Sequence, residues 1–116
     1  MTDQSTTVQE LREIFREFVT KRQWTQFHSP KNLAMSLVVE TAELLEHFLW
    51  MENSESLKVT QDSEQFEAIR DEIADVAGNI FCLCNALGVD LSEAVRNKMS
   101  KNVVKYPEER FQGRYK

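Results

Sequence analysis

Two long segments of this chain repeat apolar residues with the period of an α-helix, and each carries a pair of acids at the same spacing. The pairs are Glu40-x-x-Glu43 and Glu72-x-x-Asp75, with twenty-eight residues between Glu43 and Glu72. Residues three apart on a helix differ by about 60° in direction, so both carboxylates of a pair project from one side. If the two helices pack side by side, the four acids converge.

The position of these acids on their helices favours a ligand role. Both pairs border the apolar seam, at roughly 60° to 80° from its centre, whereas purely solubilising acids more often lie opposite. Converging carboxylates repel one another and lose hydration, so they are held together most readily by a divalent cation. Ligands that are all oxygen favour Mg²⁺, with Mn²⁺ as an alternative. Such acid pairs are also common on solvent-facing helices without function, so the pattern alone leaves both readings open.

The composition predicts a single all-α domain covering residues 1–116. Only three glycines and two prolines occur in 116 residues, and 41% of the residues are apolar, which suits one helical core of modest size. We expect a cytoplasmic protein without a membrane segment, because no apolar run approaches the roughly 18 residues that would be needed and the first residues are polar. A net charge of −5 argues against nucleic-acid binding. Cys82 and Cys84 are predicted to be free, mostly buried thiols.

Capping signals predict four long helices. The first begins at a capping box, Thr7-x-x-Glu10, and ends around residues 22–24. The others are expected at about 30–51, 63–87 and 90–105, supported by Ser29 and Pro30, by Gly88, and by Asp90-x-x-Glu93. A polar stretch before residue 63 separates the second helix from the third, and the tail after Pro107 is expected to be irregular.

Three motifs make the stretch from Trp24 to Tyr106 resemble a known family. They are W-x-x-F-H-x-P-K-N-L from Trp24, DEIADV around the second acid pair, and K-x-x-K-N-x-x-K-Y-P from Lys98. Together with the acid pairs, they resemble the MazG-like all-α nucleoside triphosphate pyrophosphohydrolases, in particular the single-domain branch that includes dCTP pyrophosphatases. This resemblance implies a four-helix MazG-like bundle that oligomerises.

The resemblance also implies an activity and a metal site. It implies Mg²⁺-dependent hydrolysis of a (deoxy)nucleoside triphosphate to a monophosphate and pyrophosphate, with house-cleaning of dCTP-like or non-standard nucleotides as the role. By similarity, Glu40, Glu43, Glu72 and Asp75 are the catalytic and metal-holding residues, and one of them accepts a proton from water as general base. Which carboxylate does so stays open.

The same resemblance implies a set of substrate contacts. Trp24 and Trp50 correspond to positions that line the base pocket, although core packing is the common role of tryptophan. Trp50 is expected on the same helical face as Glu43. His28 and Asn32 lie in the turn beside the pocket, where His28 either contacts substrate or fixes the turn. The phosphate contacts are expected from the last helix: Lys98, Asn102, Lys105 and Tyr106. These cations also suit a helix C-terminus without any ligand.

Two departures from the dCTP pyrophosphatase branch affect the expected substrate. Phe15 stands where that branch carries a histidine, and Asn79 stands where it carries a tyrosine. Phe15 cannot form a hydrogen bond to a base, whereas Asn79 can donate and accept one. We therefore expect a broader deoxynucleotide range than dCTP alone.

Self-association is expected from the third helix, where Ile80, Phe81 and Leu83 cover more of the surface than one neighbouring helix buries. The resemblance implies a homodimer or a homotetramer. A different class of protein, a non-catalytic helical nucleotide-binding or interaction module, is the alternative. A di-iron bundle is disfavoured because its Glu-x-x-His signature is missing.

Overall fold

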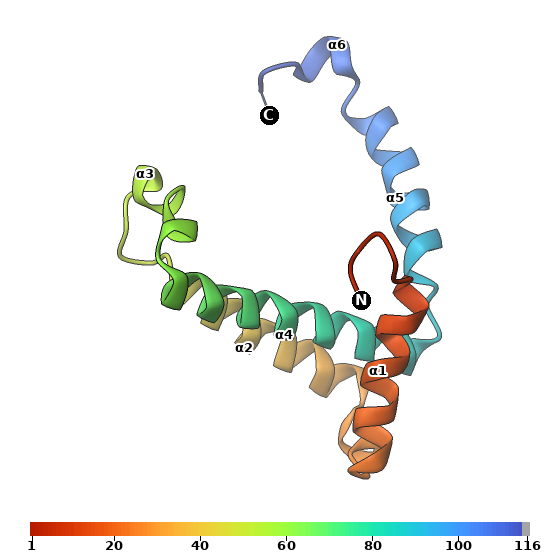
Figure 1. The fold of residues 1–116 in the computed structure, drawn as a ribbon. Coiled ribbons are helices and arrows are strands. Elements are labelled where there is room, and N and C mark those ends of the chain that lie inside the picture. The colour runs from red at the N-terminus through yellow and green to blue at the C-terminus, as the bar shows by residue number, and fades with distance from the viewer. Residues whose placement is uncertain (115–116) are drawn as a thin grey trace.

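The computed structural model describes residues 1–114, and these residues form helices without any strand (Figure 1). The longer helices are α1 (Val8–Lys21), α2 (Pro30–Glu46), α4 (Ser63–Leu87) and α5 (Leu91–Lys105). The shorter ones are η1 (Thr25–Phe27), α3 (Asn53–Ser56), η2 (Val59–Gln61) and α6 (Glu108–Phe111). The predicted all-α class is confirmed. Residues 115 and 116, part of the predicted irregular tail, lie outside the described residues.

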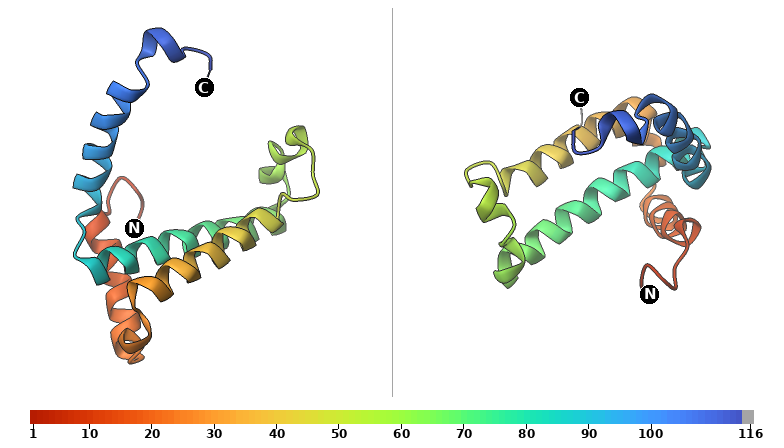
Figure 2. Two further views of the ribbon diagram at one scale, coloured as in Figure 1. Left: turned by 180° about the vertical axis from the view of Figure 1, so that it is seen from behind. Right: turned by 90° about the horizontal axis from the view of Figure 1, so that it is seen from above.

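Helices α2 and α4 run antiparallel and form the central layer, with α1 crossing the end of α4 (Figures 1 and 2). Val19 of α1, Leu33 of α2 and Cys82 of α4 are buried where the three helices meet. Phe15 and Leu83 pack against this cluster. The core is therefore small and holds α1 against the layer that carries the two acid pairs.

The predicted capping residues are confirmed at the starts of the long helices. The side chains of Thr7, Ser29 and Asp90 each accept a hydrogen bond from the backbone three residues later, which satisfies a donor that has no partner within the helix. At the end of α4, Gly88 adopts a left-handed φ of 66°, a conformation that glycine reaches without a Cβ clash. Local sequence therefore fixes where most of the helices begin and end.

Two expectations about the helices are wrong. Helix α2 ends at Glu46 instead of Met51, because the chain then tightens into turns in which Phe48 donates to the Leu45 carbonyl and Met51 to the Phe48 carbonyl. The tail expected to be irregular contains α6, and the polar stretch between α2 and α4 contains α3 and η2. Phe111 of α6 and Tyr106 at the end of α5 stack edge to face at 5.2 Å between ring centroids, a contact that no helical period in this short segment indicates.

The turn after α1 positions Trp24. The backbone of Gln23 adopts a left-handed φ of 56°. The amide of Gln23 donates to the Thr20 carbonyl and that of Trp24 to the Val19 carbonyl, which together make a Schellman motif. The apolar contact that usually accompanies this motif is formed by Trp24 and Phe18, whose rings meet edge to face at 5.7 Å. The sequence carries no glycine here, so this turn was not predicted.

Helix α5 leaves α4 at an angle of 100° and runs away from the α2–α4 layer (Figures 1 and 2). Its side chains at Val95, Met99 and Val103 are 53%, 53% and 67% exposed, and they share one face because they are four residues apart. Among residues 1–114, no single helix is both long and apolar enough to cross a membrane. Only α4 and α5 taken together are long and apolar enough, and the chain bends by 100° between them.

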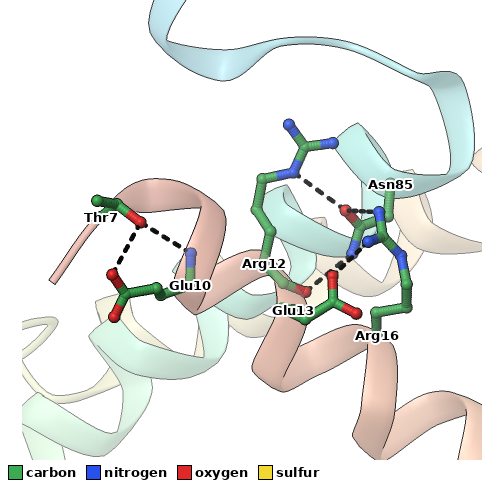
Figure 3. A network of polar contacts seen from close by, with 6 residues as sticks. All are labelled: Thr7, Glu10, Arg12, Glu13, Arg16 and Asn85. Carbon is green, nitrogen blue, oxygen red and sulfur yellow. Dashed lines mark hydrogen bonds and ion pairs between the residues drawn. The ribbon is translucent and has the colours of Figure 1, made fainter.

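A polar network fastens α1 to the C-terminal half of α4 (Figure 3). The Oδ1 atom of Asn85 accepts hydrogen bonds from Arg12 Nε at 3.0 Å and from Arg16 Nη2 at 3.1 Å. The Nδ2 atom of Asn85 donates to the backbone carbonyl of Arg12 at 3.2 Å. One half-buried amide thus satisfies three groups of α1, and Arg16 is also paired with Glu13.

Replacing Asn85 tests this attachment. Asn85→Ala should lower the free energy of unfolding by about 1–2 kcal/mol, because two hydrogen bonds from charged groups and one to a carbonyl are lost. Urea unfolding followed by circular dichroism measures the change. Asn97→Ala, at an exposed position of α5, controls for the gain in helix propensity. If both variants unfold at the same urea concentration, the network does not stabilise the fold.

Candidate metal centre and nucleotide pocket

The packing of α2 against α4 brings three of the four predicted acids together. One carboxylate oxygen from each of Glu40, Glu43 and Glu72 lies within 4.8 Å of the other two. The fourth acid, Asp75, is exposed and lines a cavity together with Glu40. The converging geometry that the two spacings predict is therefore present between α2 and α4.

Two of these carboxylates are held in a setting that disfavours their charged form. The pKa of Glu40 is raised from 4.5 to about 7, first by burial and then by Glu43, Asp75 and Glu72. Burial also raises the pKa of Glu72, followed by the charges of Glu43 and Asp75, while His47 acts in the opposite direction. Like charges and lost hydration together make this cluster unfavourable without a cation.

The donor set fits a divalent cation. The Oε2 atoms of Glu40 and Glu72 are buried and have no hydrogen-bond partner within residues 1–114. A buried carboxylate oxygen without a partner is costly, and a cation between the three acids would satisfy both. Carboxylate oxygens are the ligands of hard cations. This group of acids can therefore bind a metal.

A cavity of about 240 Å³ opens beside these acids, and we call it the metal-side cavity. Its walls come from α1, from the turn before α2, and from one side of α2 and α4. They are Phe15, Phe18, Val19, Trp24, His28, Glu40, Asp75, Gly78, Asn79 and Cys82. Burial raises the pKa of the Cys82 thiol, which favours the uncharged form of this side chain. The cavity thus brings aromatic rings and carboxylates to one space.

The structure places four of the predicted substrate-binding residues in different settings. Trp24, His28 and Asn79 line the metal-side cavity, and Asn79 Nδ2 donates to the Asp75 carbonyl at 3.0 Å. The side chain of Asn32 lies in the turn, where its Nδ2 donates to the Phe27 carbonyl.

Trp50 is 93% exposed and lies beyond the end of α2. The expectation that it shares a helical face with Glu43 is wrong, because α2 ends at Glu46 before reaching it.

The predicted phosphate contacts all lie on α5 or at its end. Lys98 and Lys105 are exposed, Asn102 is half-buried, and Tyr106 caps the helix. Because α5 runs away from the α2–α4 layer (Figures 1 and 2), one chain does not bring these residues to its own acid cluster. Their role stays a prediction.

Sequence reasoning missed four residues of the cavity wall, Phe18, Val19, Gly78 and Cys82. Phe18 is 44% exposed and lines the cavity together with Trp24. Gly78 follows Asp75 by one helical turn. A glycine in the middle of a helix costs stability relative to alanine, and this cost was the signal in the sequence that the position has a special requirement.

The model of the MazG-like family matches residues 35–116. The chain therefore belongs to the MazG-like family.

Curated relatives and a solved structure agree with this placement. The dCTP pyrophosphatase 1 proteins of Mus musculus and Homo sapiens are each 36% identical to this chain over 101 residues, which is 87% of this chain and 59% of each relative. The chain thus spans about 59% of the length of these relatives. A crystal structure of a pyrophosphatase from Archaeoglobus fulgidus is 40% identical, with a TM-score of 0.78, covering 85% of this chain and 91% of that one.

The raised pKa of Glu40 predicts how stability depends on pH without metal. Between its ordinary value of 4.5 and about 7, the folded protein holds more protons than the unfolded chain, so the free energy of unfolding falls as pH rises through this window. Urea unfolding in the presence of a chelator at pH 5 and pH 7 measures this slope. Glu40→Gln should flatten it, and Glu67→Gln, at an exposed position of α4, should leave it unchanged. A wild-type stability that is constant over this window would contradict the prediction.

Proposed function

We propose that this protein hydrolyses nucleoside triphosphates, with deoxynucleotides preferred, to the monophosphate and pyrophosphate. The observation that carries the proposal is the convergence of Glu40, Glu43 and Glu72 beside a cavity lined by Trp24 and Asn79. Anionic phosphates need a cation among these acids, and an aromatic base suits the ring-lined end. The names of the relatives, dCTP pyrophosphatase 1 and pyrophosphatase, support the same reaction. A house-cleaning role against dCTP-like or non-standard nucleotides would follow.

The resident cation is proposed to be Mg²⁺, with Mn²⁺ as a substitute. Glu40, Glu43, Glu72 and Asp75 would hold it, and when bound it would neutralise phosphate charge and acidify a water. The carboxylate that takes up the proton from the attacking water is one of these four. Trp24 and His28 would orient the nucleoside in the metal-side cavity.

A non-catalytic nucleotide-binding module remains the alternative. It would keep the cavity but release no pyrophosphate. Incubating the protein with Mg²⁺ and each of the common deoxynucleoside triphosphates separates the two functions. Pyrophosphate release from at least one substrate supports the enzyme, and binding without release from the whole panel supports the module.

Removing one acid should abolish turnover without unfolding the protein. Glu43→Gln or Asp75→Asn should lower kcat/KM by at least about 100-fold, since changes to groups around metal ligands alone cost 10–100-fold. Neither change should lower the melting temperature, because like-charge repulsion is relieved at the same time. Pyrophosphate release and thermal unfolding are the two measurements.

The matched controls are Glu46→Gln on α2 and Glu67→Gln on α4, both exposed positions. They remove the same charge from the same helices and should keep full activity. Full activity in Glu43→Gln would exclude that residue from the metal site, and a loss of activity in the controls would show a general charge effect.

We also propose that copies of this chain associate through α5, as a dimer or a dimer of dimers. The face formed by Val95, Met99 and Val103 is exposed along its length, and α5 has no extensive packing against the rest of residues 1–114. Exposed apolar rows of this kind favour burial against another chain. Association would also let Lys98 and Asn102 reach phosphates bound in a neighbouring copy.

A charge on this face should break the association. Val103→Asp places a carboxylate on the exposed apolar row and should lower the molar mass measured by light scattering towards that of one chain, which is 13.6 kDa. Asn97→Asp adds the same charge at a different angle around α5 and should leave the mass unchanged. If wild-type protein is already a monomer at micromolar concentration, the proposed association fails.

A further inference from the structure

Two cavities meet at Phe15. One is the metal-side cavity, and the other, of about 430 Å³, lies between α1 and the C-terminal half of α4, where Arg16 and Asn85 line it. We call this second space the α1–α4 cavity. Four residues line both spaces and so stand between them: Phe15, Val19, His28 and Cys82. The two cavities are therefore neighbours separated by side chains alone.

We call these four residues the partition between the cavities. Phe15 is the residue of the partition that can be changed without removing the core. Val19 and Cys82 are buried where α1, α2 and α4 meet, and His28 belongs to the turn before α2. Phe15 is half-buried and has the largest side chain of the four. Its ring packs on Phe81 at 6.0 Å between centroids, which fixes one side of the partition.

Gly78 fixes the other side. A Cβ added at Gly78 would lie 2.5 Å from Cε1 and 2.7 Å from Cζ of Phe15, which is closer than carbon atoms pack. The Phe15 ring therefore occupies the space that any other residue at position 78 would fill. Because Gly78 follows Asp75 by three residues, the ring lies one helical turn from an acid of the proposed metal site.

We propose that Phe15, seated against Gly78, limits the metal-side cavity to nucleotides with a single-ring base. This inference rests on the proposed function, because it takes the metal-side cavity as the site of the nucleoside. At about 240 Å³ the cavity is below the roughly 300–1,000 Å³ that is typical of small-molecule pockets. The phenyl ring offers no hydrogen bond, so it selects by volume. Without the ring the two cavities would join and a two-ring purine base would fit.

Shortening this side chain should change which base is accepted. Phe15→Ala should raise the ratio of kcat/KM for dATP over dCTP by about 10-fold or more, the scale on which apolar pockets discriminate by size. Phe15→Leu keeps the core filled better and should shift the ratio in the same direction by less. Phe66→Leu is the matched control, because Phe66 lies in the first turn of α4, lines neither cavity and should leave the ratio unchanged.

Calorimetric binding gives a readout that does not need turnover. Titration of dAMP and dCMP with Mg²⁺ present should show tighter dAMP binding to Phe15→Ala than to wild type, with dCMP binding changed little. Gly78→Ala acts on the same contact from the other side. Its Cβ displaces the ring, so this variant should alter the dAMP to dCMP ratio although neither Phe15 nor an acid is changed.

The outcomes separate the two proposals. Turnover by Phe15→Ala and Phe15→Leu with the wild-type base ratio overturns the role of Phe15. Wild-type protein that releases no pyrophosphate from any triphosphate overturns the proposed function, and the binding ratio then decides alone whether Phe15 limits base size. If Phe15→Ala is unfolded by circular dichroism, Phe15→Leu and Gly78→Ala decide the question. An equal change of the ratio in Phe66→Leu would overturn the partition, because that residue lines neither cavity.

Discussion

Electrostatic repulsion between carboxylates on α2 and α4 is the constraint on which the rest of the site depends. Burial and neighbouring charge raise the pKa of Glu40 to about 7, which shows that the packing of two apolar seams holds acids where they are individually unfavourable. Helix packing thus provides the free energy that keeps the acids together, and a cation would lower the cost of doing so. This explains why the acids border the seam: farther away, their oxygens would not converge.

In the proposed function, α2 and α4 supply the acids of the nucleotide site and α1 supplies its aromatic residues. The turn at Gln23 returns the chain so that Trp24 meets Phe18, and both rings line the cavity that Glu40 and Asp75 also line. Asn85 holds α1 on α4 through Arg12 and Arg16 (Figure 3). The cavity therefore depends on polar contacts outside it, since the shared apolar core of Val19, Leu33 and Cys82 is small.

The sequence predicted those features that depend on one helix at a time. Capping residues such as Thr7 and Asp90 located helix starts, and the three-residue spacing of acids located the charged cluster. It could not predict features that depend on two helices or on a rare backbone angle. The left-handed Gln23 has no glycine to mark it, and the direction of α5 depends on a bend after Gly88. Ile73 belongs to the apolar repeat of α4 but is 52% exposed, because periodicity identifies an apolar face without showing how much of it another helix covers.

The acids and the ring of Phe15 come from different helices, and this affects how the substrate of such a site can change. The carboxylates lie on α2 and α4, whereas the ring of Phe15 comes from α1 and meets α4 at Gly78 and Phe81. In the proposed function, phosphate chemistry and base size are therefore set by different helices, and the contact at Gly78 lies within one turn of Asp75. A substitution on α1 can alter the cavity without moving an acid, whereas a side chain at position 78 must displace the ring. Gly78 is thus the point at which the two requirements are coupled, and this coupling gives a physical reason for a glycine in the middle of a long helix.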